Sequence, residues 1–140
     1  MYDKVIHALK NAEKIAIFMH INPDGDCISS ALALYTFLTK LGKNAVVFAP
    51  EDLNNLPVKM AILKNFDKLT PSQGVQASFD LAIAVDAAGF NRLSDDNARI
   101  FINAKKKVVI DHHVSHAEYG NITLLNENAS STAEIVYILL

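Results

Sequence analysis

Acidic and imidazole side chains follow three short apolar segments of this chain at equivalent positions. His20 comes directly after the first segment, and the sequence INPDGD that follows it contains Asp24 and Asp26. Asp86 follows the second segment, and the sequence Asp-His-His at residues 111–113 follows the third. Carboxylates that gather in one place repel one another unless their pKa values rise or cations compensate their charge. We therefore expect these residues to form either a cluster of carboxylates with raised pKa values or a cation site.

The mixture of donors indicates which cations the cluster would hold. Carboxylate oxygens combined with imidazoles suit Mn²⁺, Mg²⁺, Fe²⁺ or Zn²⁺. The seven candidate side chains are too many for one small cation and supply most of the ligands of two; they are His20, Asp24, Asp26, Asp86, Asp111, His112 and His113. Two cations about 3.5–4 Å apart are a common arrangement for phosphoester hydrolysis. We therefore expect two divalent cations and a phosphoester substrate.

Each part of the cluster also has a purely structural explanation. The sequence Pro-Asp-Gly at residues 23–25 is typical of a turn, and Asp26 is placed to cap a helix. Asp86 alone is weak evidence, whereas three polar residues at 111–113 have no packing use after a buried strand. The coincidence of three such strand ends favours a functional site over a domain in which a cation only stabilises the core.

These side chains meet only if the segments before them are neighbouring strands. Five apolar runs are short and nearly continuous, which is typical of strands covered on both faces and hence of a parallel sheet. The five runs are Ile15–Met19, Ala45–Ala49, Leu81–Val85, Val108–Ile110 and Ile122–Leu125. In open α/β sheets, ligands bind beyond the carboxyl ends of the strands. We therefore expect the candidate residues to converge on one crevice there.

Helical patterns lie between the predicted strands. They cover Tyr2–Leu9, Ile28–Tyr35, Ser94–Ile102 and Ser131–Leu140. Gly42 is expected to end the second helix. Ser131 and Glu134 are expected to form a capping box at the start of the last helix, and Tyr137 is expected on the apolar stripe of that helix. The alternation predicts a doubly wound α/β fold, with a mostly parallel five-stranded sheet and helices on both faces. We expect one domain over residues 1–140, with a loop at Leu69–Ala77.

The composition limits the classes of partner. The 140 residues are 51% hydrophobic, carry a net charge of −2 and include one cysteine, Cys27. No apolar run is long enough to span a membrane and no signal peptide is apparent, so we expect a cytoplasmic protein in a reducing compartment. The balance of 13 basic and 15 acidic residues argues against duplex DNA as a partner.

Residues near the cluster are weaker candidates. Ser30 lies in the first turn of a predicted helix whose free N–H groups could hold a phosphate, and Arg92 is placed to reach one. Helix capping and a surface ion pair explain these two residues equally well. We expect His7 and His116 to face solvent and Cys27 to be a small buried side chain without special reactivity.

Taken together, the motifs resemble those of a known family. His20 to Asp26, the strand-end Asp86 and the sequence Asp-His-His at 111–113 are similar to motifs one, two and three of the DHH phosphoesterases. The sequence SSTAE at 130–134 resembles the segment that follows in the branch of bifunctional oligoribonucleases and phosphoadenosine-phosphate phosphatases. This resemblance implies hydrolysis of short single-stranded oligonucleotides or nucleotide 3′-phosphates, with Mn²⁺ as the preferred cation.

The resemblance also implies a role for each residue. His20 and Asp24 would hold the first cation, Asp26 and His112 the second, and Asp86 would bridge both. His113 would face the substrate as a catalytic residue. Asp111 would orient a ligand imidazole by a hydrogen bond.

The chain departs from the family pattern in two respects. Ser29 stands where the family usually has glycine. A further aspartate and a C-terminal substrate-binding domain would fall after Leu140, so we expect a catalytic lobe with a weak second cation site, and full activity to require the additional residues. The apolar last helix suggests either a homo-oligomer or a surface that another partner covers. The alternatives are a hydrolase like the family II pyrophosphatases and exopolyphosphatases, or a noncatalytic nucleotide-binding module.

Overall fold

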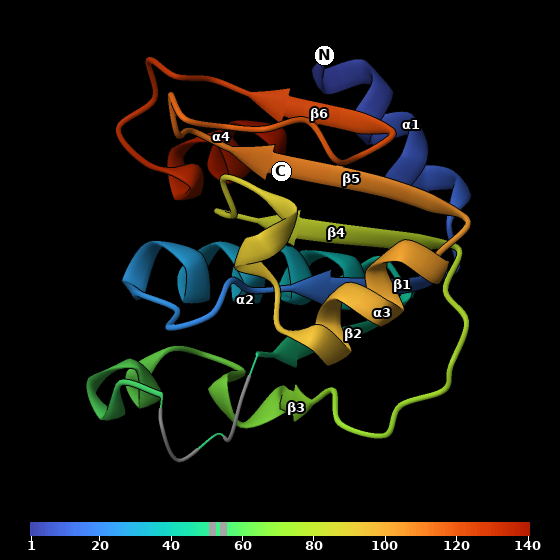
Figure 1. The fold of residues 1–140 in the computed structure, drawn as a ribbon, viewed down its shortest axis with the longest axis vertical. Helices are drawn as coiled ribbons and strands as arrows, with labels where there is room; N and C mark the ends of the chain where they lie inside the picture. The colour runs from blue at the N-terminus through green and yellow to red at the C-terminus, as the bar shows by residue number, and fades with distance from the viewer. Residues whose placement is uncertain (51–52, 54–55) are drawn as a thin grey trace.

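Six parallel strands form one sheet in a computed structural model that describes residues 1–50, 53 and 56–140 (Figure 1). The strands lie in the order β3-β2-β1-β4-β5-β6, and each is parallel to its neighbours. Their bounds are β1 Lys14–Phe18, β2 Asn44–Ala49, β3 Leu69–Pro71, β4 Leu81–Val85, β5 Lys106–Asp111 and β6 Ile122–Leu125. All five predicted runs are strands, which confirms the parallel α/β fold.

The sixth strand corrects the prediction of five. β3 occupies the start of the segment Leu69–Ala77, which we expected to be a loop. It pairs with β2, and Leu69 of β3 lies opposite Val47 of β2. Three residues are too few to show a strand period, and Pro71 is a residue that sheets tolerate only at an edge. The sequence signal was therefore too short to reveal this edge strand.

Helices cover both faces of the sheet, as predicted. The α-helices are α1 Tyr2–Asn11, α2 Gly25–Lys40, α3 Asp95–Asn103 and α4 Thr132–Leu139, and the short 3₁₀ helices are η2 Val58–Ile62, η3 Phe66–Lys68 and η4 Phe90–Arg92. One apolar cluster joins α1, α2 and α4 to the face that carries Ile17, and a second joins α3 to the face that carries Phe18. Figure 1 shows α3 in front of the strands and α2 behind them.

The ends of two helices follow the sequence signals in part. Gly42 has φ +77° just after α2 ends at Lys40, which confirms the predicted stop. The Ser131 hydroxyl accepts the N–H of Glu134 at 3.1 Å, whereas the Glu134 carboxylate accepts the N–H of Ser130 instead of that of Ser131. The side chain of Tyr137, predicted on the apolar stripe, is 83% exposed. The buried residues of α4 are Thr132, Ile135, Val136 and Leu139.

The strand order places a ligand site at the centre of the sheet. From β1 the chain goes outward to β2 on one side, and β4 returns to pair with β1 on the other. The carboxyl ends of β1 and β4 therefore flank the point where the winding direction changes, which is where open α/β sheets bind ligands.

Among the described residues, no helix has both the length and the apolar character that a membrane crossing requires.

Candidate metal centre

The carboxyl ends of β1, β4 and β5 bring together most of the predicted site residues. His20 lies two residues beyond β1, Asp86 directly follows β4, and Asp111 is the last residue of β5. Because β4 pairs with both β1 and β5, imidazoles from two distant segments approach the Asp86 carboxylate. The structure thus confirms the expected convergence of separate segments on one region.

Asp86 occupies the centre of this region. Its Oδ2 atom lies 3.7 Å from Nε2 of His20, and its Oδ1 atom lies 3.8 Å from Nε2 of His112 and 3.7 Å from Nδ1 of His113. The residue is 3% exposed and adopts φ +59°. For a residue other than glycine, this left-handed conformation costs about 1–3 kcal/mol and is typical of functional positions. The two oxygens of one buried carboxylate therefore face two different groups of potential ligands.

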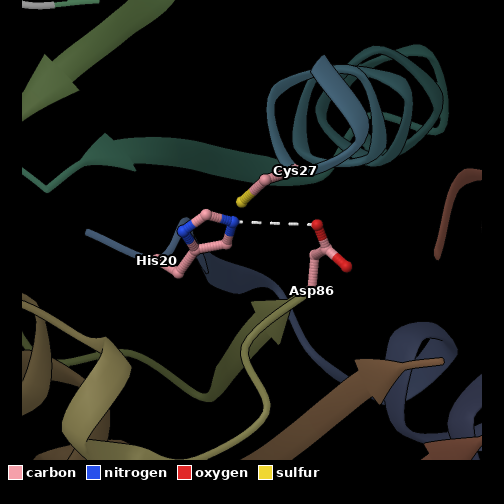
Figure 2. A group of neighbouring side chains, drawn as sticks. All are labelled: His20, Cys27 and Asp86. Carbon is pink, nitrogen blue, oxygen red and sulfur yellow. Dashed lines mark ion pairs between the residues drawn. The ribbon is translucent and has the colours of Figure 1, made fainter. Parts of the chain in front are cut away.

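The first group consists of His20, Cys27 and Asp86, whose potential ligand atoms all lie within 4.8 Å of one another (Figure 2). Nδ1 of His20 is 2.7 Å from the carbonyl oxygen of Ile21. Because a carbonyl only accepts, Nδ1 carries the proton and Nε2 keeps its lone pair for a ligand. Burial alone would lower the pKa of His20, but the Asp86 carboxylate and the Ile21 carbonyl raise it above its ordinary 6.5.

Asp24, the other predicted ligand of the first cation, lies outside this group. Its side chain is exposed, and its Oδ1 atom accepts the N–H of Cys27 at 3.1 Å, so that Asp24 is the N-cap of α2. The cap that the sequence suggested for Asp26 thus belongs to Asp24. A carboxylate that caps with one oxygen keeps the other for a cation.

The second group consists of Asp86, His112 and His113. Nδ1 of His112 lies 3.3 Å from the carbonyl oxygen of Ala129, which leaves Nε2 as the donor atom by the same argument as for His20. That Nε2 atom lies 3.8 Å from Oδ2 of Asp26 and 3.8 Å from Oδ1 of Asp86. A histidine that follows β5, a carboxylate from α2 and the carboxylate that follows β4 therefore face one another.

Asp26 is held by the N-terminus of α4, more than a hundred residues further along the chain. Its Oδ2 atom accepts the N–H of Thr132 and its Oδ1 atom that of Ala133, both at 2.8 Å. The Ser30 hydroxyl donates to the same Oδ1 atom at 3.4 Å. Ser30 is completely buried, so it supports Asp26 and does not face the solvent as a substrate contact would.

Asp111 is completely buried and binds two imidazoles. Its Oδ1 atom accepts Nδ1–H of His113 and its Oδ2 atom accepts Nδ1–H of His116, both at 2.7 Å. Burial alone would raise the pKa of Asp111, but these hydrogen bonds lower it below its ordinary 3.8. The imidazoles that Asp111 orients are thus those of His113 and His116, whereas its hydrogen bond with the candidate ligand His112 comes from the backbone N–H, which donates to Oδ1 at 2.8 Å.

The prediction for His116 was wrong, because its side chain is only 1% exposed. It stacks on Tyr119, with ring centroids 5.8 Å apart. His7, in contrast, is exposed as expected, and so is Arg92, whose carbonyl oxygen accepts the N–H of Ile21. Arg92 therefore belongs to a segment that lies beside the backbone next to His20.

Three residues of this region were not predicted as parts of the site: Cys27, His116 and Thr132. The SSTAE segment pointed to a helix start, but only the packing of α4 on α2 brings the Thr132 hydroxyl to 2.8 Å from Oδ1 of Asp86. Nothing in the local pattern around His116 separates it from an exposed residue.

The fold and these side chains define a class of protein: a doubly wound α/β domain with candidate metal ligands at the switch point of its sheet. The model of the DHH family, N-terminal domain, matches residues 14–140. The chain belongs to the DHH family.

Similar proteins support this assignment. A bifunctional oligoribonuclease and PAP phosphatase, NrnA, of Thermus thermophilus is 31% identical over 135 residues, which are 94% of this chain and 38% of the relative. A protein of the same description from Mycoplasma genitalium is 34% identical over 79% of this chain and 33% of its own length. The crystal structure of an exopolyphosphatase-related protein from Bacteroides fragilis matches with a TM-score of 0.88 and 26% identity, covering 99% of this chain and 42% of that one. The chain thus spans about two-fifths of the length of such relatives.

Proposed function

We propose that this chain is the cation-binding lobe of a divalent-metal-dependent phosphoesterase that hydrolyses short oligonucleotides and nucleotide 3′-phosphates. The observation that carries the proposal is the position of Asp86, whose two oxygens face His20 on one side and His112 on the other. A carboxylate so placed is suited to bridge two cations. The names of the relatives, oligoribonuclease and PAP phosphatase, support the substrate class.

The donor set fits two cations of the Mn²⁺ type. We assign His20 and Asp24 to the first, Asp26 and His112 to the second, and Asp86 to both. His20 and His112 each present an Nε2 lone pair, because Nδ1 of each is hydrogen-bonded to a backbone carbonyl. When bound, such cations supply Lewis-acid stabilisation of a phosphoryl group and activation of water.

The other residues position the substrate. His113 lies beside His112, with ring centroids 4.6 Å apart, and its side chain is 43% exposed. Because Nδ1–H is donated to Asp111, the Nε2 atom is the one available to a phosphoryl oxygen, to which it donates when the ring is protonated. The charge of that imidazolium would be balanced by buried Asp111. Exposed Arg92 is a further candidate contact for a phosphate.

The test combines binding with turnover. Calorimetric titration of the protein with Mn²⁺ should reveal a site that is lost in Asp86→Ala, and Mn²⁺ should support release of phosphate from phosphoadenosine phosphate or cleavage of a short RNA. Turnover without any divalent cation, or unchanged Mn²⁺ binding by the variant, would contradict the proposal. A protein that bound nucleotides but no Mn²⁺ would instead be the noncatalytic module.

One observation favours a second candidate, an exopolyphosphatase or pyrophosphatase: the structural neighbour described as exopolyphosphatase-related. Both reactions need the same two cations and differ only in the group that carries the phosphate. Inorganic pyrophosphate and polyphosphate, assayed beside phosphoadenosine phosphate under the same Mn²⁺ conditions, separate the two. Faster turnover of the inorganic substrates would replace the nucleotide assignment.

A further inference from the structure

A thiol lies among the ligands that the proposed function assigns to the first cation. Cys27 is completely buried in the first turn of α2, and its Sγ atom is 3.6 Å from the carbonyl oxygen of Val85. Figure 2 shows the sulfur pointing toward the His20 ring, next to the ring nitrogen that faces Asp86. The sulfur, an His20 nitrogen and an Asp86 oxygen all lie within 4.8 Å of one another.

The donors around the sulfur are prepared for a ligand. The His20 side chain is 8% exposed, its Nδ1–H is donated to Ile21, and its Nε2 atom lies 3.7 Å from Asp86 Oδ2, beyond hydrogen-bond distance. A nitrogen and an oxygen bound to one tetrahedral Zn²⁺ at roughly 2.0–2.2 Å stand about 3.3–3.5 Å apart. The two atoms of His20 and Asp86, 3.7 Å apart, need to move only slightly to bind one such cation.

The third donor then depends on the cation. Asp24 is exposed and caps α2, so the sulfur of Cys27, and not the carboxylate of Asp24, completes the three-residue group with His20 and Asp86. Mn²⁺ and Mg²⁺ prefer oxygen, whereas Zn²⁺, Co²⁺ and Cd²⁺ accept thiolate readily. A set of one nitrogen, one sulfur and one oxygen is a zinc-type donor set.

We propose that Cys27 makes this group a site for thiophilic divalent cations, which compete there with the Mn²⁺ of the proposed function. The inference rests on that function only in using His20 and Asp86 as ligands. On binding, the Sγ–H bond breaks, an Sγ–metal bond forms, and the proton leaves to solvent. Such a cation takes Cys27 as its third ligand, whereas Mn²⁺ takes Asp24.

The test uses Co²⁺ alone as the probe, followed by absorption spectroscopy. Cys27 is the only cysteine of the chain, so a thiolate-to-cobalt charge-transfer band can come from no other residue. We expect wild type to give this band in proportion to bound Co²⁺, and excess Mn²⁺ to reduce it. Cys27→Ala should lack the band, and its affinity for Co²⁺ should fall by at least the roughly tenfold that loss of a partner of a metal ligand costs.

Asp24→Asn provides the matched control. It should keep the cobalt band and lose affinity for Mn²⁺, the reverse of the effect expected for Cys27→Ala. Binding of Mn²⁺ by wild type together with Co²⁺ binding that shows no thiolate band overturns this inference and leaves the proposed function intact. Failure to bind either cation overturns both. The wild-type spectrum decides between these results even if a variant does not fold.

Discussion

The hydroxyl of Thr132 donates a hydrogen bond to Oδ1 of Asp86 at 2.8 Å, and both residues are buried. The backbone N–H of the same Thr132 binds Asp26. One residue at the N-terminus of α4 thus holds two of the candidate ligands. The positive end of a helix favours nearby carboxylates, so α4 offsets part of their mutual repulsion in the absence of cations.

This relationship makes Thr132 a positioning residue for the bridging carboxylate. Thr132→Val keeps the shape of the side chain and removes the hydroxyl, so Asp86 loses a partner that fixes its orientation. We expect affinity for Mn²⁺ to fall by about tenfold. Isothermal titration calorimetry measures the change directly.

Thr132→Ser is the control, because it keeps the hydroxyl and loses only a methyl group. Its affinity for Mn²⁺ should stay close to that of wild type. If valine and serine variants bind Mn²⁺ equally well, the hydroxyl has no role in holding Asp86. Circular dichroism of both variants shows whether α4 still forms.

Removal of the charge of Asp86 should abolish the stabilisation of the folded protein by Mn²⁺. A ligand that binds only the folded state at 100 times its Kd raises the free energy of unfolding by about 2.7 kcal/mol. We expect Mn²⁺ to raise the free energy of unfolding of wild type by about this amount, seen in thermal melts as a higher melting temperature than in EDTA. Asp86→Asn should show no shift with Mn²⁺, and a shift as large as that of wild type would show that the cation binds elsewhere.

Sequence patterns predicted the framework of this fold because buried parallel strands leave a strong local signal. The runs around Ile17, Ile83 and Val109 are apolar on both faces, and each is followed by the ionisable residues of the site. Strand-end position alone was sufficient to bring His20, Asp86 and His112 together. The exception was β3, whose three residues carry no period.

The finer contacts could not be predicted because they depend on tertiary packing. The sequence suggested Asp26 as the cap of α2, whereas Asp24 makes that cap, and no local signal revealed that Asp26 binds the start of α4. His116 follows a polar segment and has the sequence context of an exposed residue, yet the chain turns so that its ring packs on Tyr119. Such long-range relations have no counterpart in local periodicity.

His116 should affect catalysis only through Asp111 and His113. His116→Leu leaves one oxygen of a buried carboxylate without its donor, at a cost of about 1–3 kcal/mol in the free energy of unfolding. It also frees Asp111 to turn away from His113. We expect kcat for bis-p-nitrophenyl phosphate with Mn²⁺ to fall by about tenfold, with a smaller effect on KM.

Two variants separate positioning from a general loss of structure. His116→Asn places an amide donor near the position of Nδ1 and should restore most of kcat. In a His113→Ala background, His116→Leu should cause no further loss of kcat, because the residue through which it acts is gone. An additional loss in that background would mean that His116 acts by another route.

Asp80 should make stability depend on pH far from the candidate metal centre. Its carboxylate accepts Nζ of Lys105 at 2.9 Å and the backbone N–H groups of Lys14 and Glu13, so it joins the segments that begin β1, β4 and β5. These hydrogen bonds, and that from Lys105 most of all, lower the pKa of Asp80 from 3.8 to about 2. Since the folded state holds the carboxylate more acidic than the unfolded state does, its contribution is complete above the ordinary pKa and disappears as the pH falls through the folded value.

Urea denaturation of wild type and Asp80→Asn over a range of pH tests this expectation. The difference in free energy of unfolding should be constant between about pH 7 and pH 5 and should shrink progressively below about pH 4, as the wild-type carboxylate takes up a proton. Lys105→Met keeps the two backbone hydrogen bonds and should lose only part of the pH dependence.

Added salt should weaken the Lys105 contribution, because that ion pair is exposed. A difference that does not change with pH would mean that Asp80 stabilises the strand ends by its shape and neutral hydrogen bonds, and not by its charge.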